Sequence, residues 1–223
     1  MKIALIGGTG DIGEGLALRW GLETTHEILI GSRARDKAEE RARAYAQRLE
    51  DAGRKGKPAI LGLANEDAAR EGDVVVLCVE ADHVVATVRS LREILREDQI
   101  VVSPAVSMVR RGKFFFYAPP PEGSLAAQIA GLLPENTPLV SALHTVPAHK
   151  LADLDTRLDQ NVVVLGDDEA AKRTVMGLIS EMAGLRPLDG GPLAAGSLVE
   201  SITPLLINLA IVNKRKDLGI KFV

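Results

Sequence analysis

The chain has 223 residues, 46% of them hydrophobic, and a formal net charge of −3 at pH 7. This length and apolar content suffice for one large domain, or for a nucleotide-binding domain with a smaller addition. The acidic balance excludes a general nucleic-acid binder, which needs a basic field, and the single cysteine, Cys78, excludes an internal disulfide and is typical of a reducing compartment.

The first predicted element is an apolar strand over 2–6, which follows Met1 directly and so leaves no room for a signal peptide. A glycine-rich turn comes next, in which Gly8, Gly10 and Gly13 have the G-x-G-x-x-G spacing of dinucleotide-binding folds. Gly8 permits the tight turn, Gly10 lets a pyrophosphate approach the backbone, and Gly13 lets helix and strand pack closely. We expect the pyrophosphate to lie at the start of the following helix, on a turn formed by Gly8, Thr9, Gly10, Asp11, Ile12 and Gly13.

The end of the second predicted strand, over 26–30, indicates which dinucleotide binds. NAD-binding folds usually place an acidic residue there to hold the ribose hydroxyls, but here the strand runs into Ser32 and Arg33. Ser32 can donate to a 2′-phosphate, Arg33 can grip it with a fork of N–H groups, and Lys37 follows one helical turn later. Two charge-assisted bonds of roughly 1.5–3 kcal/mol each would favour NADP over NAD. The alternative is a basic helix start that is merely solvated.

The next stretch alternates regularly between helices and strands. We expect helices over 36–52, 66–71 and 81–96, strands over 59–63, 73–79 and 100–103, and a solvated basic loop over 53–58. Asn65 and Gly72 are predicted to cap the short helix between them. The continuous apolar run over 73–79 is typical of a parallel strand that is covered on both faces. The pattern therefore predicts an α/β fold with a Rossmann-type, doubly wound, mainly parallel sheet.

The pattern loosens after Pro104, where residues 105–121 include a Phe-rich cluster and three consecutive prolines. We expect two parts, an NADP-binding domain over 1–147 and a small C-terminal α/β region over 148–223 that closes over it. No apolar run approaches the ~20 residues that span a bilayer, so we expect a cytoplasmic protein without a membrane partner. The elements expected in this half are helices over 124–133, from 169 through 183 (with Asp167-Asp168 as its cap) and over 196–213 (interrupted at Pro204), and strands over 139–143 and 161–165.

Blocks of residues along nearly the whole chain resemble one known family. The most specific are His144-Thr145-Val146-Pro147 and two C-terminal blocks, over 198–205 and 218–222; the others are Gly7–Gly10 with Gly15–Arg19, Ile30–Arg33 with Lys37, Val101–Pro104, Val140–Ala148 and Gly184–Asp189. In these blocks the chain resembles the coenzyme F420-dependent NADP reductases. Residues 80–83 and the Phe- and Pro-rich loop depart from the family's pattern.

The resemblance implies hydride transfer between C4 of a nicotinamide and C5 of the deazaflavin, with NADP and coenzyme F420 as the two small-molecule substrates. It places the segment 144–148 under the nicotinamide, with Val146 packed on a ring and Ala148 leaving room for the carboxamide. His144 would help to position the rings, or would simply cap backbone carbonyls. Cofactor contacts are also expected from Val79, Ser103, Pro104 and Thr203. No acid–base catalyst is required, and one Cys with four scattered His gives no metal-ligand spacing.

Several of these residues have a second interpretation. Ser103-Pro104 lies at the carboxyl end of a strand, where ligands bind in open α/β sheets, but the proline also simply stops the strand. Glu200 and Thr203 share a helix face and would address the deazaflavin's polar edge or, as we favour for Glu200, a homodimer interface. Lys214-Arg215-Lys216 would attract the acidic tail of coenzyme F420 or merely suit a helix C-terminus. For the protein as a whole, the alternatives are an NADP-dependent imine or keto reductase and a non-catalytic NADP-binding redox sensor.

Overall fold

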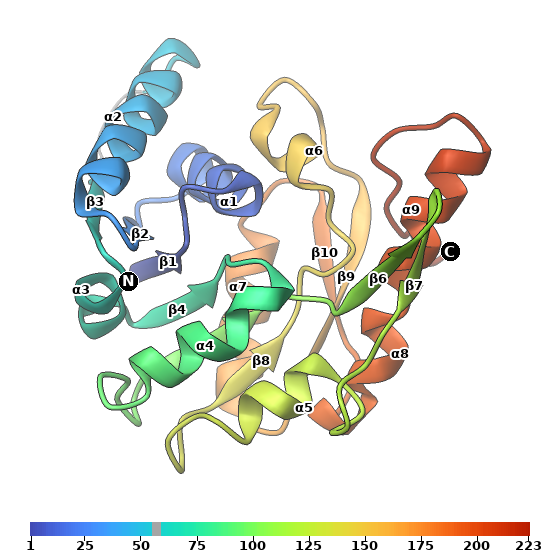
Figure 1. The fold of residues 1–223 in the computed structure, drawn as a ribbon. Coiled ribbons are helices and arrows are strands. Elements are labelled where there is room, and N and C mark those ends of the chain that lie inside the picture. The colour runs from blue at the N-terminus through green and yellow to red at the C-terminus, as the bar shows by residue number, and fades with distance from the viewer. Residues whose placement is uncertain (55–58) are drawn as a thin grey trace.

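The computed structural model describes residues 1–54 and 59–223, so most of the predicted basic loop lies outside the described residues. Its centre is an eight-stranded sheet in the order β10-β9-β8-β5-β4-β1-β2-β3 (Figure 1). Among the described pairings, β8 and β9 are antiparallel and the others in this sheet are parallel. The mainly parallel, doubly wound sheet is therefore confirmed. The strands are β1 (Lys2–Ile6), β2 (Glu27–Ser32), β3 (Ile60–Ala64), β4 (Val74–Leu77), β5 (Ile100–Ser103), β8 (Leu139–Ser141), β9 (Gln160–Gly166) and β10 (Leu185–Asp189).

Helices cover both faces of the sheet. Alternate side chains of β1 point to opposite faces, so Ile3 and Leu5 join one core while Ala4 and Ile6 join the other. The first core takes its helical side chains from α1, α2, α6 and α7, and the second from α3, α4, α5 and α8. The helices are α1 (Asp11–Glu23), α2 (Arg35–Asp51), α3 (Asn65–Glu71), α4 (Ala81–Leu91), α5 (Leu125–Ala130), α6 (Ala148–Ala152), α7 (Glu169–Ser180), α8 (Gly196–Glu200) and α9 (Ile202–Val212).

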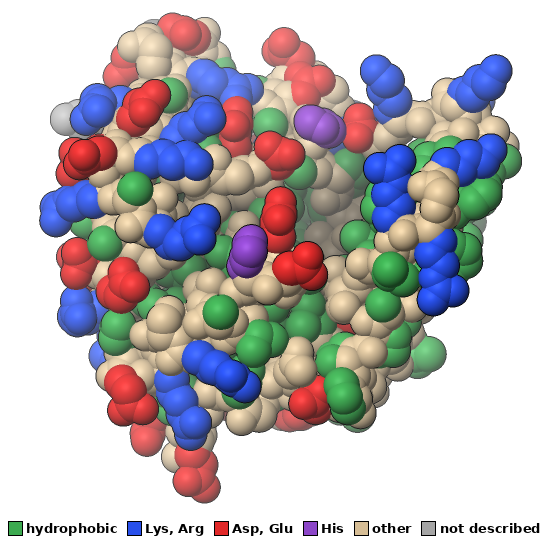
Figure 2. All heavy atoms as spheres, viewed as in Figure 1, with side chains coloured by type: hydrophobic (Ala, Val, Ile, Leu, Met, Phe, Trp, Pro, Cys, Tyr) green, Lys and Arg blue, Asp and Glu red, His purple; other side chains and the backbone are tan. Residues whose placement is uncertain are grey.

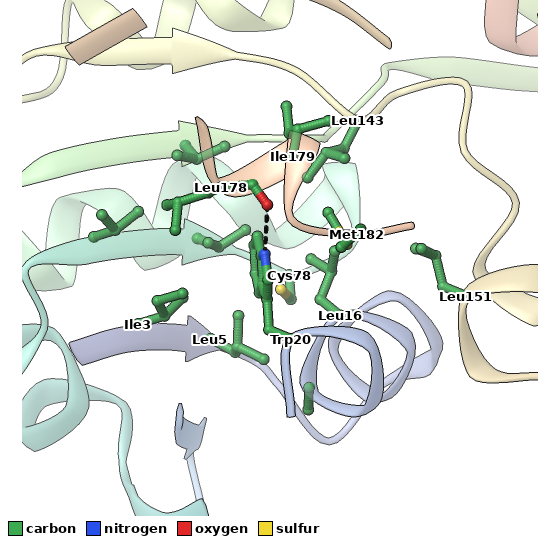
Figure 3. Close-up of a cluster of buried hydrophobic side chains, with 14 of the residues drawn as sticks. Ile3, Leu5, Leu16, Trp20, Cys78, Leu143, Leu151, Leu178, Ile179 and Met182 are labelled. Atoms are coloured by element: carbon green, nitrogen blue, oxygen red, sulfur yellow. Dashed lines mark hydrogen bonds between the residues drawn. The ribbon is translucent and has the colours of Figure 1, made fainter. Parts of the chain in front are cut away.

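Trp20 connects the N-terminal and C-terminal halves of the chain within the first core. Its ring is buried, and its indole Nε1–H donates to the carbonyl of Leu178 in α7 at 2.9 Å (Figure 3). A buried indole needs such a partner, because an unpaired N–H in an apolar core costs free energy. The contact fixes α1, which follows the glycine-rich turn, against the C-terminal half of the chain.

The predicted division at residue 147 runs through a continuous sheet. Strand β9, from the C-terminal part, pairs with β8 from the N-terminal part through Val140 and Gly166. The last residues return to this strand as well, since the N–H of Asn161 donates to the carbonyl of Ile220 at 2.7 Å. We propose that residues 1–147 and 148–223 are two domains that share this sheet.

The irregular region after Pro104 contains a hairpin that the sequence pattern does not predict. Strands β6 (Met108–Arg111) and β7 (Phe114–Tyr117) pair as an antiparallel hairpin with Gly112 at its turn, where φ is +61°. Arg110 lies across the strands from Phe115, with its guanidinium 5.8 Å from the ring centre. The side chain of Asn208 bonds to both the N–H and the carbonyl of Phe115, so the hairpin is held along α9.

The apolar C-terminal helix also differs from its prediction. It divides at Ser201 rather than at Pro204, because Pro204 lies in the first turn of α9, where no intrahelical N–H bond is lost. By length and composition alone, the helical stretch Leu193–Val212 could cross a membrane, so the expectation that no apolar run reaches that length is wrong. Glu200 in this stretch is fully buried within the fold. The helix over 81–96 is shorter than expected and ends at Leu91.

Candidate functional site

The glycine-rich turn is held in one conformation by close backbone approaches. Gly7 has φ +73°, a conformation that favours glycine, and an added Cβ on Gly13 would lie 2.4 Å from Gly8 Cα. On Gly10 the nearest atom to an added Cβ is the Gly7 carbonyl oxygen, at 3.6 Å, so this glycine leaves its outer side open. Gly10 precedes Asp11, the first residue of α1. The first N–H groups of a helix have no partner within it, and they form an anion-binding end.

Two side chains that the sequence reasoning missed stabilise this turn. The hydroxyl of Tyr45 in α2 donates to the carbonyl of Gly8 at 3.2 Å, and burial raises the pKa of Tyr45 to about 12. The side-chain oxygen of Asn65 accepts from the N–H of Gly7 at 3.1 Å. Asn65 is therefore not the cap of α3, whose capping residue is Ala64. The only sequence signal for this contact is an asparagine directly after β3. Asparagine at the start of a helix more often caps that helix, so the sequence favours the capping role.

The predicted phosphate clamp and the turn line one cavity of about 650 Å³. Ser32 ends β2 and is buried, whereas Arg33, directly after β2, and Lys37, in the first turn of α2, are exposed. The strand ends in Gly31 and Ser32, so its tip carries no acidic side chain. The predicted cofactor-binding residues that line this cavity are Thr9, Gly10, Ser32, Arg33, Lys37 and Val79. Its lining also includes Asn65, Glu80, His83 and Thr87, for which no cofactor contact was predicted.

A second cavity, of about 380 Å³, contains the other predicted cluster. His144, Val146 and Thr203 line it, and apolar side chains of α9 form one wall. The Thr203 hydroxyl donates to the carbonyl of His144 at 2.9 Å, so α9 is attached directly to the segment after β8. The α9 and C-terminal residues of this lining are Leu206, Ile207, Ala210, Ile211, Arg215, Asp217 and Leu218.

His144 is uncharged near neutral pH. Its ring is buried, and burial lowers its pKa to about 4. Nε2 lies 2.9 Å from the Ser141 hydroxyl, whereas buried Nδ1 has no hydrogen-bond partner among the described residues. The imidazole is thus held by one nitrogen, and it brings no positive charge into the cavity.

This burial predicts an acid-sensitive contribution to stability. The folded protein keeps His144 neutral down to about pH 4, whereas an unfolded histidine takes up a proton near its ordinary pKa of about 6.5. Unfolding therefore binds a proton, and the contribution present above pH 6.5 is lost as the pH falls, by up to about 3 kcal/mol. In urea unfolding, we expect His144→Gln to flatten the decline between pH 6.5 and 4, and the exposed His149→Gln to leave it unchanged. Equal slopes in wild type and His144→Gln would contradict this.

Glu200 has a different role from the predicted ones. Its carboxylate accepts from the N–H groups of Leu125 and Ala126 at 3.0 and 2.9 Å, and from the Tyr117 hydroxyl at 2.9 Å. The side chain caps the start of α5 from inside the fold and ties the hairpin to it, so placing it at a subunit interface or on the deazaflavin was wrong. Burial raises the pKa of Tyr117, and the neighbouring Glu200 carboxylate raises it further.

The remaining predicted residues line neither of the two cavities. Ser103 is buried at the end of β5, where its hydroxyl accepts from the N–H of Ala105 at 3.4 Å, and Pro104 follows it half-buried. Ala148 is the first residue of α6. Gly8 lies in the turn itself, and Asp11, Ile12 and Gly13 form the first turn of α1. Over residues 1–54 and 59–223, no group of three or more His, Cys, Asp or Glu side chains is arranged to hold a metal ion.

Both cavities lie at the same edge of the sheet. The parallel strands β2, β1, β4, β5 and β8 are neighbours in this order, and Ser32, the glycine-rich turn, Val79, Ser103 and His144 follow or end them in turn. Ligands of open α/β sheets bind outside these carboxyl ends. Figure 2 shows a hollow in this part of the surface. Basic side chains lie along the β6–β7 hairpin, on the side of the hollow opposite α4.

A doubly wound sheet with a glycine-rich turn and a basic second strand end defines a nicotinamide-dinucleotide-binding protein of the Rossmann type. Comparisons with known proteins agree. The model of the family described as "NADP oxidoreductase coenzyme F420-dependent" matches residues 2–107. The chain is 41% identical to the F420-dependent NADP reductase of Methanocaldococcus jannaschii over 99% of this chain and 97% of the relative.

Two further relatives match almost the whole chain. The F420-dependent NADP reductase of Methanothermobacter thermautotrophicus is 36% identical, over 99% of this chain and 94% of the relative. A crystal structure from an Arthrobacter species, provisionally assigned as an F420-dependent NADP reductase, superposes with a TM-score of 0.82 at 26% identity, covering 100% of this chain and 99% of that one. The chain belongs to the family of F420-dependent NADP reductases, which confirms the resemblance found in the sequence.

Proposed function

We propose that this protein catalyses reversible hydride transfer between NADP(H) and the deazaflavin coenzyme F420. The observation that carries the proposal is the pair of cavities along one sheet edge. One is lined by Ser32, Arg33 and Lys37, which suit a 2′-phosphate, and the other is a largely apolar space beside His144 and Val146. The two cavities would hold the nicotinamide and the deazaflavin, whose rings would meet at the carboxyl ends of the strands.

The residues in this arrangement bind, orient and exclude water, because the two coenzymes supply the redox chemistry themselves. The turn Gly8–Gly13 and the clamp would hold the phosphates of NADP(H), and Val79 would pack nearby. Val146 is buried and would form an apolar support for a ring, with Ala148 beside it and Thr203 holding the segment in place. Ser103 and Pro104 would complete the floor between the two cavities.

The neutral state of His144 suits this reaction. The oxidised nicotinamide carries a positive charge, and a nearby imidazolium would disfavour it by Coulomb repulsion in a poorly solvated space. Because burial keeps His144 uncharged at working pH, the residue can position a ring in both directions of the reaction without this penalty.

A spectrophotometric assay tests the proposal. Mixing the purified protein with NADPH and F420 is expected to bleach the visible absorbance of the oxidised deazaflavin, and the reverse reaction is expected to restore it. NADH should be a much poorer donor. Absence of any bleaching over the accessible pH range would refute the proposed reaction. Turnover of imine or carbonyl compounds instead would point to the alternative reductase.

We also propose that the protein is a cytoplasmic homodimer that pairs through α8 and α9. Leu205, Leu209 and Val212 are exposed at spacings that place them on one face of α9, and Leu198 is exposed on α8. A two-fold axis across this face would bury the same residues of both copies. Sedimentation should give twice the 23.8 kDa chain mass, and Leu205→Glu with Leu209→Glu should give the monomer. A monomeric wild type would overturn the proposal.

A further inference from the structure

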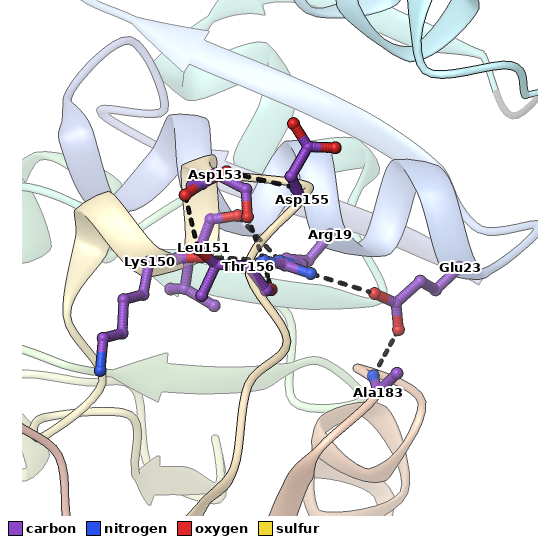
Figure 4. A network of polar contacts seen from close by, with 8 residues as sticks. All are labelled: Arg19, Glu23, Lys150, Leu151, Asp153, Asp155, Thr156 and Ala183. Carbon is purple, nitrogen blue, oxygen red and sulfur yellow. Dashed lines mark hydrogen bonds and ion pairs between the residues drawn. The ribbon is translucent and has the colours of Figure 1, made fainter.

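A network of polar contacts outside the two cavities surrounds Arg19 on α1 (Figure 4). The side chain is buried, at 3% exposed, although arginines are seldom buried without partners. Its Nε–H donates to the carbonyl of Leu151 at 2.9 Å, and Nη2 donates to those of Lys150 and Thr156, each at 2.8 Å, and to that of Asp153. Glu23, one turn further along α1, lies 3.6 Å from Nη1 and supplies the opposite charge.

All four carbonyls belong to one short segment. They come from the end of α6 and the turn after it, where helical carbonyls have no partner within the helix. A cation at this end also satisfies the helix dipole. Glu23 in turn accepts from the N–H of Ala183, so the network reaches the turn before β10 as well. Arg19 therefore fixes the C-terminal end of α6 to α1.

The same helix face makes a second contact with α6, four residues earlier. An added Cβ on Gly15 would lie 2.5 Å from Leu151 Cβ and 3.1 Å from the Ala148 carbonyl oxygen. Gly15 and Arg19 thus bring α6 against α1 at close range. Helix α1 begins at the dinucleotide turn, and α6 begins directly after Val146 and Pro147.

We propose that Arg19 is a positioning residue for hydride transfer. It fixes the ring-facing segment 144–148 at a set distance from the turn that holds the dinucleotide phosphates. The catalytic part of this inference rests on the proposed function. Hydride transfer needs donor and acceptor atoms about 3–3.5 Å apart, and a misplacement of about 1 Å costs up to about 100-fold in rate. Arg19 touches neither cavity in the structure, so it acts through α6.

The test combines kinetics with amide hydrogen exchange in Arg19→Met, Arg19→Lys and Arg48→Met. Arg48 is the matched control, because its guanidinium donates to the carbonyl of Ala152 from an exposed position. For Arg19→Met we expect kcat to fall about tenfold, the KM for NADPH to stay within about twofold, and the deuterium isotope effect on kcat to rise. Amides of 148–156 should exchange faster while those of the sheet do not. Arg48→Met should behave like wild type.

Arg19→Lys separates positioning from mere stability, and it remains informative if Arg19→Met does not fold. Lysine keeps the charge beside Glu23 but lacks the planar fork, so we expect the thermal midpoint to recover while kcat stays at least about threefold low. An unchanged kcat and isotope effect in a folded variant, or a loss confined to the KM for NADPH, would overturn the proposal. If the wild type transfers no hydride, the proposed function fails, and unchanged exchange over 148–156 would then refute the positioning role by itself.

Discussion

Replacing Arg33 with alanine is expected to lower kcat/KM for NADPH by about 10- to 100-fold, because a charge-assisted bond to the 2′-phosphate is worth about 1.5–3 kcal/mol. With NADH the value should change by less than about threefold, since NADH has no 2′-phosphate for Arg33 to hold. The expected loss follows from the position of Arg33, exposed at the tip of β2 on the wall of the larger cavity. Steady-state kinetics with the two donors and a fixed F420 concentration measures both values.

Arg35→Ala is the matched control for this change. Arg35 is two residues away, pairs with Glu39 at 3.1 Å and does not line the cavity. It should leave the ratio of the two kcat/KM values unchanged. If Arg33→Ala weakened NADPH and NADH equally, Arg33 would not be reading the 2′-phosphate and the clamp would be misassigned.

Replacing Glu200 with alanine is expected to lower the free energy of unfolding by about 3–5 kcal/mol, because it leaves buried donors without an acceptor. Those donors are the N–H groups of Leu125 and Ala126 and the hydroxyl of Tyr117. Glu200→Gln keeps one carbonyl acceptor, so the expected loss is smaller, about 1–2 kcal/mol. Urea unfolding with linear extrapolation measures both changes.

The control for Glu200 is Glu122, a surface carboxylate that contacts the same helix, α5. Glu122 accepts from the Gln128 side chain at 3.2 Å in an exposed position, and its alanine variant should change stability by less than about 0.5 kcal/mol. A loss below about 1 kcal/mol in Glu200→Ala would mean that the carboxylate is not needed at the start of α5.

The sequence predicts the nucleotide half well because the relevant signals there are local. The glycine spacing, the absence of an acidic residue after β2 and the nearby Ser32, Arg33 and Lys37 lie within a short stretch of chain. Backbone geometry then forces them to one sheet edge. Asp168 was predicted in the same way and is confirmed, since its side chain accepts from the N–H of Ala171 at the start of α7.

The residues that the sequence misassigned or left without a role depend on distant partners. Glu200 on an apolar helix resembles an interface residue until α5, about 75 positions earlier, brings two N–H groups to it. Arg19 has the pattern of an ordinary helical arginine, and its four carbonyl partners lie more than 130 positions further on. Asn65 resembles a helix cap, but its acceptor oxygen binds Gly7. The spacing of residues within one helix or strand cannot predict these contacts.

Direct transfer of the hydrogen tests the central claim most closely. NADPH that carries deuterium at C4 of the nicotinamide, prepared separately with each of the two C4 labels, is mixed with the protein and F420 in ordinary water. Mass spectrometry then measures the label in the reduced deazaflavin. We expect one of the two labelled donors to give one deuterium for each F420 reduced, held at C5. Reduced F420 without deuterium from either donor, or no reduced F420 at all, would contradict hydride transfer between the two coenzymes.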